Sequence, residues 1–68
     1  MTSKLQMTWL RDNPSGLSFI VLAGTREVVI PRSLVEYRRK WKDPKRDVVE
    51  FTLPDWKIKQ ENLTEYVI

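Results

Sequence analysis

The chain has 68 residues and a formal net charge of +3, with no cysteine and no histidine. This length fits one small domain, residues 1–68, and the two missing residue types exclude disulfides, thiolate zinc sites and most nucleophile-and-base catalysis. No segment approaches the roughly 20 apolar residues of a membrane span, so we expect a cytoplasmic protein without membrane contact.

The first predicted strand covers residues 4–11. Apolar and polar side chains alternate here, and Leu5, Met7 and Trp9 fall on one face. A period of two is typical of a half-buried strand, so we expect these three side chains in the core. Residues 12–16, with the sequence DNPSG, are turn formers and end the strand.

A hairpin is predicted next along the chain. Residues 17–23, LSFIVLA, form a compact apolar run typical of a central strand, and residues 26–30, REVVI, form a second β-prone run. Gly24 and Thr25 between them are enough for a tight turn, and glycine suits the backbone conformation that such turns require.

Residues 33–41 allow two interpretations. Ser33 stands three positions before Glu36, which fits a capping box and would start a helix. In a strand, β-branched and aromatic side chains would alternate on one face, and we favour the strand for this reason. The side chains of that face would be Val35, Tyr37, Arg39 and Trp41.

The partner of this strand is predicted at residues 47–53, DVVEFTL, where apolar side chains again occupy alternate positions. The connecting loop is expected to cover residues 42–46. Pro44 lies in the middle of this segment, and proline belongs in a turn because it cannot donate to the hydrogen-bond ladder of a central strand.

A short helix is predicted after this hairpin. Pro54 suits a first helical turn, where its missing N–H has no partner to lose, and Asp55 suits the positive end of the helix dipole. Trp56 and Leu63 share one helical face and would anchor the helix to the core. Asn62 occupies a position where the helix would end in a left-handed residue.

These elements predict the fold class. Residues 64–68, TEYVI, would add a short closing strand. We therefore expect a mainly β domain of the small α+β type, in which about five antiparallel strands form a small barrel or curled sheet with one short C-terminal helix. Trp9 and Trp56 both have a phase that points inward, so they are predicted to be core residues.

Residues 17–63 resemble a group of small bacteriophage and mobile-element accessory proteins. Members of this group carry a Val-Trp-Ile-Pro-Lys-Ser segment and, later, a Pro-Glu-Trp-Leu-Ala helix that ends in Gly-Leu. This sequence departs from the pattern at Val29, Ile58 and Asn62. The resemblance implies a phage-type accessory protein in the cytoplasm of a bacterial host, and it carries no catalytic residues over. The matching positions are Ile30, Pro31, Arg32, Ser33, Pro54, Asp55, Trp56 and Leu63.

The main functional signal is the stretch RRKWKDPKR, residues 38–46. It holds six of the twelve basic residues and a single acid, Asp43, so six positive charges minus one negative charge give +5. We interpret it as a basic hairpin that contacts the phosphates of nucleic acid, with aromatic rings that stack on bases. The candidate nucleic-acid-binding residues are Tyr37, Arg38, Arg39, Lys40, Trp41, Lys42, Lys45 and Arg46, joined by Arg32 if the fold brings it near.

Two other interpretations stay open. The basic run can be a solvated edge hairpin whose lysines prevent aggregation, with Trp41 in the core. Alternatively, the protein is a phage-type inhibitor or adaptor that binds an acidic host protein, in host takeover or anti-defence. The sequence does not distinguish DNA from RNA, or a monomer from an edge-paired dimer. We expect no enzymatic activity, catalytic residues, metal ligands or cofactor, since the carboxylates are dispersed and glycine is scarce.

Overall fold

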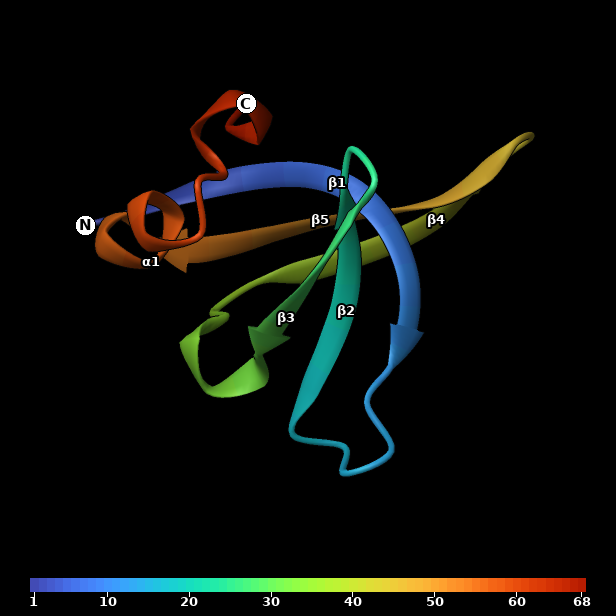
Figure 1. Ribbon diagram of the computed structural model, residues 1–68, viewed down its shortest axis with the longest axis horizontal. Helices are drawn as coiled ribbons and strands as arrows, with labels where there is room; N and C mark the ends of the chain where they lie inside the picture. Colours follow the sequence, from blue (N-terminus) through green and yellow to red (C-terminus); the bar gives the residue numbers. More distant parts are fainter.

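The computed structural model describes residues 1–68 and contains one five-stranded antiparallel sheet, one short α-helix and two turns of 3₁₀-helix (Figure 1). This confirms the predicted fold class. The strands are β1 (Thr2–Asp12), β2 (Ser18–Ala23), β3 (Arg26–Pro31), β4 (Arg38–Asp43) and β5 (Arg46–Pro54). The helix α1 is Asp55–Gln60, and the 3₁₀ turns are η1 (Arg32–Leu34) and η2 (Thr64–Tyr66).

Strand β1 is the centre of the sheet, whose order is β3-β2-β1-β5-β4. Its first part, from Thr2 to Thr8, pairs with β5, and its second part, from Thr8 to Asp12, pairs with β2. The pairing register shifts between Trp9 and Arg11, as at a β-bulge, and bulges increase the local bend and twist of a strand. Figure 1 shows the resulting strong curvature of β1. Strands β3 and β4 are unpaired on their outer sides, so the sheet does not close. Of the two predicted alternatives, a small barrel and a curled sheet, the structure is the curled sheet.

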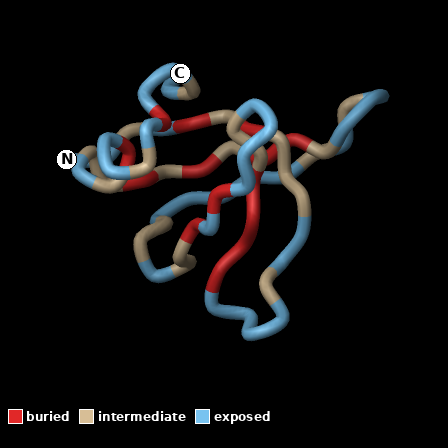
Figure 2. Tube along the Cα trace, viewed as in Figure 1, coloured by how far each residue is buried: buried red, intermediate tan, exposed pale blue.

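The core lies on the concave side of the curled sheet. The rings of Phe19 and Phe51 meet edge to face in it, with centroids 5.4 Å apart and planes at 87°. Figure 2 shows the buried segments gathered along the middle of the sheet and below α1. Burial of Leu5 and Met7 confirms the predicted inward face of β1. The core residues are Leu5, Met7, Phe19, Val21, Val28, Ile30, Val49, Phe51, Leu53, Ile58 and Leu63.

Helix α1 begins after Pro54, as predicted, but the prediction that Trp56 anchors it was wrong. Trp56 is 58% exposed, whereas Ile58 is buried in the core. At 3.6 residues per turn, two positions are about 200° apart, so a helix that buries Ile58 turns Trp56 to solvent. Leu63 is buried as expected. Asn62 has the predicted left-handed conformation, with φ of 60°.

Residues 33–41 form neither a continuous helix nor a continuous strand. Residues 32–34 form the turn η1, which has no side-chain cap, and the strand begins only at Arg38. The backbone N–H groups of Glu36 and Tyr37 donate to the hydroxyl of Thr52, at 3.0 and 3.1 Å. The side chain of Thr52 on β5 thus accepts the two N–H groups, and its backbone N–H donates to the carbonyl of Tyr37 at 3.1 Å. The strand prediction is right for residues 38–41 and wrong for residues 33–37.

Two other boundaries differ from the predictions. The hairpin loop is shorter than residues 42–46, because Lys42 and Asp43 pair with Asp47 and Arg46, leaving Pro44 and Lys45 as the turn. The chain end forms η2 instead of a closing strand, and its only strand-like contact is one antiparallel bridge between Leu5 and Val67. No helix of this fold is both long enough and apolar enough to cross a bilayer.

Candidate nucleic-acid interface

The β4–β5 hairpin carries the basic segment away from the body of the protein. In Figure 1 it extends to the side opposite α1, and Figure 2 shows its tip as exposed. The two strands stay paired in continuous register from Arg38 opposite Phe51 to Asp43 opposite Arg46. Folding therefore gathers residues 38–46 on one projecting element.

The two faces of β4 hold different side chains. Arg38 and Lys40 lie opposite the core residues Phe51 and Val49, and directly opposed residues share a face of the sheet. Arg39 and Trp41 lie opposite Glu50 and Val48 and therefore point to the other side. We call Arg38, Lys40 and Lys42 the concave row, and Tyr37, Arg39 and Trp41 the convex row.

The concave row places cations over aromatic rings. The guanidinium of Arg38 lies 5.2 Å from the centroid of the Phe19 ring, and Nζ of Lys40 lies 3.7 Å from that of Trp9. Such contacts attract a cation to the ring quadrupole and hold its side chain in place. Trp9 is half-buried against the core, in line with its predicted inward phase, although its indole Nε1 is buried without a hydrogen-bond partner. Lys42, nearer the tip, is exposed.

The convex row carries two aromatic rings, those of Tyr37 and Trp41. Tyr37 is 41% exposed, and Nζ of Lys4 from β1 lies 5.0 Å from its ring centroid. Trp41 is half-buried, and the guanidinium of Arg39 lies 4.6 Å from its ring centroid. Lys4 also reaches Glu50, with Nζ 3.8 Å from Oε1. The predicted stacking residues are thus brought to one face, with cations beside both.

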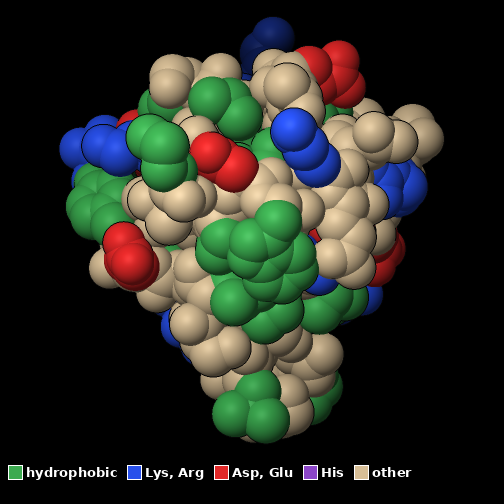
Figure 3. All heavy atoms as spheres, turned by 90° about the vertical axis from the view of Figure 1, so that its left-hand side faces the viewer, with side chains coloured by type: hydrophobic (Ala, Val, Ile, Leu, Met, Phe, Trp, Pro, Cys, Tyr) green, Lys and Arg blue, Asp and Glu red, His purple; other side chains and the backbone are tan.

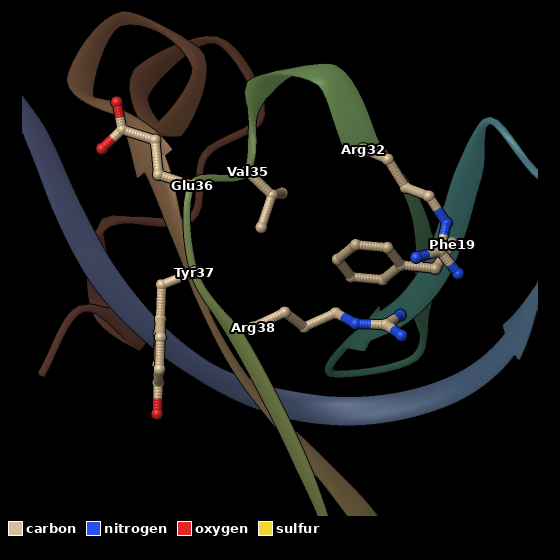
Figure 4. A pocket seen from close by; sticks show the side chains of 6 residues that line it. All are labelled: Phe19, Arg32, Val35, Glu36, Tyr37 and Arg38. Atoms are coloured by element: carbon tan, nitrogen blue, oxygen red, sulfur yellow. The ribbon is translucent and has the colours of Figure 1, made fainter.

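Arg32 and Arg38 meet at the open seam between the two edge strands. Both guanidiniums reach the Oδ1 of Asp12, at 2.7 Å from Arg32 and 3.8 Å from Arg38. They border a pocket of about 240 Å³ and extend toward Phe19, whereas Tyr37 and Glu36 extend away from it (Figure 4). Because a carboxylate already binds both arginines, this seam attracts a polyanion less than the hairpin does.

The outer part of the hairpin has unpaired positive charge. Five cationic side chains and the acid Asp43 leave +4 between residues 39 and 46, as five minus one. The paired residues of β5 add Asp47 and Glu50, so residues 39–50 together carry +2, as five minus three. None of the five forms an ion pair with a carboxylate. One of them, Arg46, donates from Nη1 to the hydroxyl of Thr8 at 2.6 Å, which fixes its direction. These residues are Arg39, Lys40, Lys42, Lys45 and Arg46.

Sequence reasoning missed four residues of this region that lie in distant segments. They contact candidate residues that lie 13 to 38 positions away in the chain, and they are Lys4, Thr8, Asp12 and Phe19. The alternation of β1 indicated that Lys4 points away from the core. It gave no sign that β5 would pair beside it and bring Tyr37 within reach.

The fold and the site together define a class of small protein: a curled antiparallel sheet with a projecting cationic hairpin. No protein-family model matches the chain, no curated protein matches it, and no solved structure matches it. The resemblance to phage accessory proteins therefore stays a prediction from residues 17–63.

Proposed function

We propose that the protein is a non-enzymatic module that binds nucleic acid through the β4–β5 hairpin. The observation that supports this most directly is the unpaired charge of +4, five cations minus one acid, between residues 39 and 46 on a projecting element. Duplex DNA carries one negative charge per about 1.7 Å of axis, and cations that approach it release condensed counterions. A cationic projection can enter a groove or follow a backbone that a flat surface would touch at one point.

The aromatic residues would add a second contribution to the binding free energy, through stacking on bases. Tyr37 and Trp41 lie on the same face of the hairpin, where bases can stack on them. Stacking contributes about 1–3 kcal/mol per base and tolerates any base, because each has a π-face. Binding would then depend little on sequence, as expected of a phage-type accessory protein that acts on nucleic acid in a bacterial cytoplasm.

A salt titration tests the proposal. Fluorescence anisotropy with labelled DNA and RNA oligonucleotides should show an affinity that falls steeply between 50 and 200 mM salt, as counterion release requires. The variant Lys42→Glu should lose most of the affinity. Lys59→Glu is the matched control, since Lys59 is exposed on α1 at the other end of the molecule and has no ion-pair partner. Equal affinities of the two variants would contradict the proposal.

One observation favours the second candidate, an adaptor or inhibitor that binds a host protein. Trp56 is 58% exposed on α1, and Figure 3 shows hydrophobic side chains gathered on this end of the molecule. Exposed tryptophan is enriched at the centres of protein interfaces. For this candidate, Trp56→Ala should abolish capture of the partner from host lysate, capture should survive nuclease treatment, and salt should affect it weakly.

A further inference from the structure

The strand β4 forms an edge of the sheet, so its outer side has no strand partner and is open to a ligand. Its convex row holds the exposed ring of Tyr37 and the half-buried ring of Trp41. Its concave row holds only cations, because the rings beneath Arg38 and Lys40 belong to the core and its margin. Groups that stack on bases and groups that bind phosphates therefore lie on opposite sides of one exposed strand.

The spacing of the rings indicates how many bases they serve. Tyr37 and Trp41 are four residues apart, which corresponds to about 13 Å at the rise of an extended strand. Two rings at this distance cannot stack on the same base. They provide two separate platforms along the hairpin, with Arg39 between them on the same face.

Each of the two rings already has a cation on one side. Lys4 lies over one side of Tyr37, and Arg39 lies over one side of Trp41. A base that stacks on the opposite side would complete a sandwich of cation, ring and base, in which the cation–π attraction persists. Each of these cations then lies beside a nucleotide and adds to its attraction for the phosphate.

We propose that the ligand is single-stranded nucleic acid, which lies along the edge of β4 with its bases on the convex row and its phosphates toward the concave row. This rests on the proposed function and specifies its substrate class. The bases of a duplex are stacked and paired inside it, so a duplex offers phosphates to Lys40 and Lys42 but no base faces to Tyr37 and Trp41. The single strand satisfies both rows at once.

The test compares one labelled oligonucleotide, as DNA and as RNA, in single-stranded form and annealed to its complement. The single strand should bind more tightly than the duplex at the same salt concentration. Tyr37→Ala and Trp41→Leu should each weaken single-strand affinity by about 5- to 140-fold, the equivalent of one stacked base, and leave the salt slope and the duplex affinity unchanged. Trp56→Ala, which removes an exposed ring far from the hairpin, is the control and should change neither affinity.

Substitutions in the concave row should give the opposite signature. Lys40→Gln and Lys42→Gln should each reduce the slope of log affinity against log salt by about 0.7 on the single strand. Duplex affinity equal to or above single-strand affinity, or no effect of Tyr37→Ala, would overturn this inference and leave the proposed function intact. If none of the oligonucleotides shows salt-dependent binding, the proposed function itself is overturned.

Discussion

The guanidinium of Arg38, on one edge of the sheet, lies 5.2 Å from the ring centroid of Phe19, on the strand beside the other edge. This contact spans the seam that the hydrogen bonds leave open. The same guanidinium reaches Asp12 at the end of β1. Arg38 therefore belongs to the scaffold as well as to the basic hairpin, and the two roles separate it from the residues nearer the tip.

Arg38→Ala should lower the free energy of unfolding by about 1–2 kcal/mol, through the loss of its cation–π contact and its share of the Asp12 ion pair. Urea denaturation followed by tryptophan fluorescence measures this. Lys42→Ala is the matched control in the same row, because Lys42 is exposed and has no ion-pair partner, and it should stay within about 0.5 kcal/mol of the parent. Equal stabilities of Arg38→Ala and Lys42→Ala would show that Arg38 does not stabilise the contact across the seam.

Asp12→Asn should change stability and binding in opposite directions. The substitution removes the carboxylate that binds Arg32 and Arg38, so each exposed ion pair lost should lower stability by about 0.2–1 kcal/mol. The two freed guanidiniums should raise affinity for nucleic acid and steepen the salt slope by up to about 0.9 each on duplex DNA. Parallel denaturation and anisotropy titrations give both quantities, and unchanged affinity would show that the seam lies outside the interface.

Trp56→Ala should reduce stability by only about 1 kcal/mol or less, although tryptophan is the largest side chain of the helix, because its ring is mostly in solvent. Ile58→Ala should cost about 2–5 kcal/mol, since it opens a cavity in the core. Thermal unfolding of the two variants under identical conditions compares them directly. A larger loss for Trp56→Ala would contradict the observed orientation of α1.

Thr52→Val should loosen the start of the hairpin. It removes the hydroxyl that accepts two backbone N–H groups, those of Glu36 and Tyr37, and we expect a cost of about 1–2 kcal/mol. Amide hydrogen exchange should accelerate at these two residues first, as measured by NMR. Thr2→Val, at an exposed position of β1, should leave their exchange rates unchanged. Unaltered exchange in Thr52→Val would mean that other contacts order this segment.

Several elements of this protein could be predicted from local sequence alone. The alternation in β1 and β5, the glycine turn at Gly24, the helix start after Pro54 and the left-handed Asn62 are all readable in short windows, because each depends on backbone preference or on a period of two. The basic run was equally visible, and its place on a hairpin followed from the β-prone segments around Pro44.

Only the tertiary structure decided which side chains meet. Arg32 and Arg38 share Asp12, Lys4 covers Tyr37, and the convex row separates from the concave row, through pairings between segments far apart in the chain. The exposure of Trp56 also depends on the tertiary structure, because α1 packs on the sheet through Ile58 and this turns Trp56 to solvent. A local period states that two faces exist, but strand register and sheet curvature decide which face encloses the core and which one is left for a ligand.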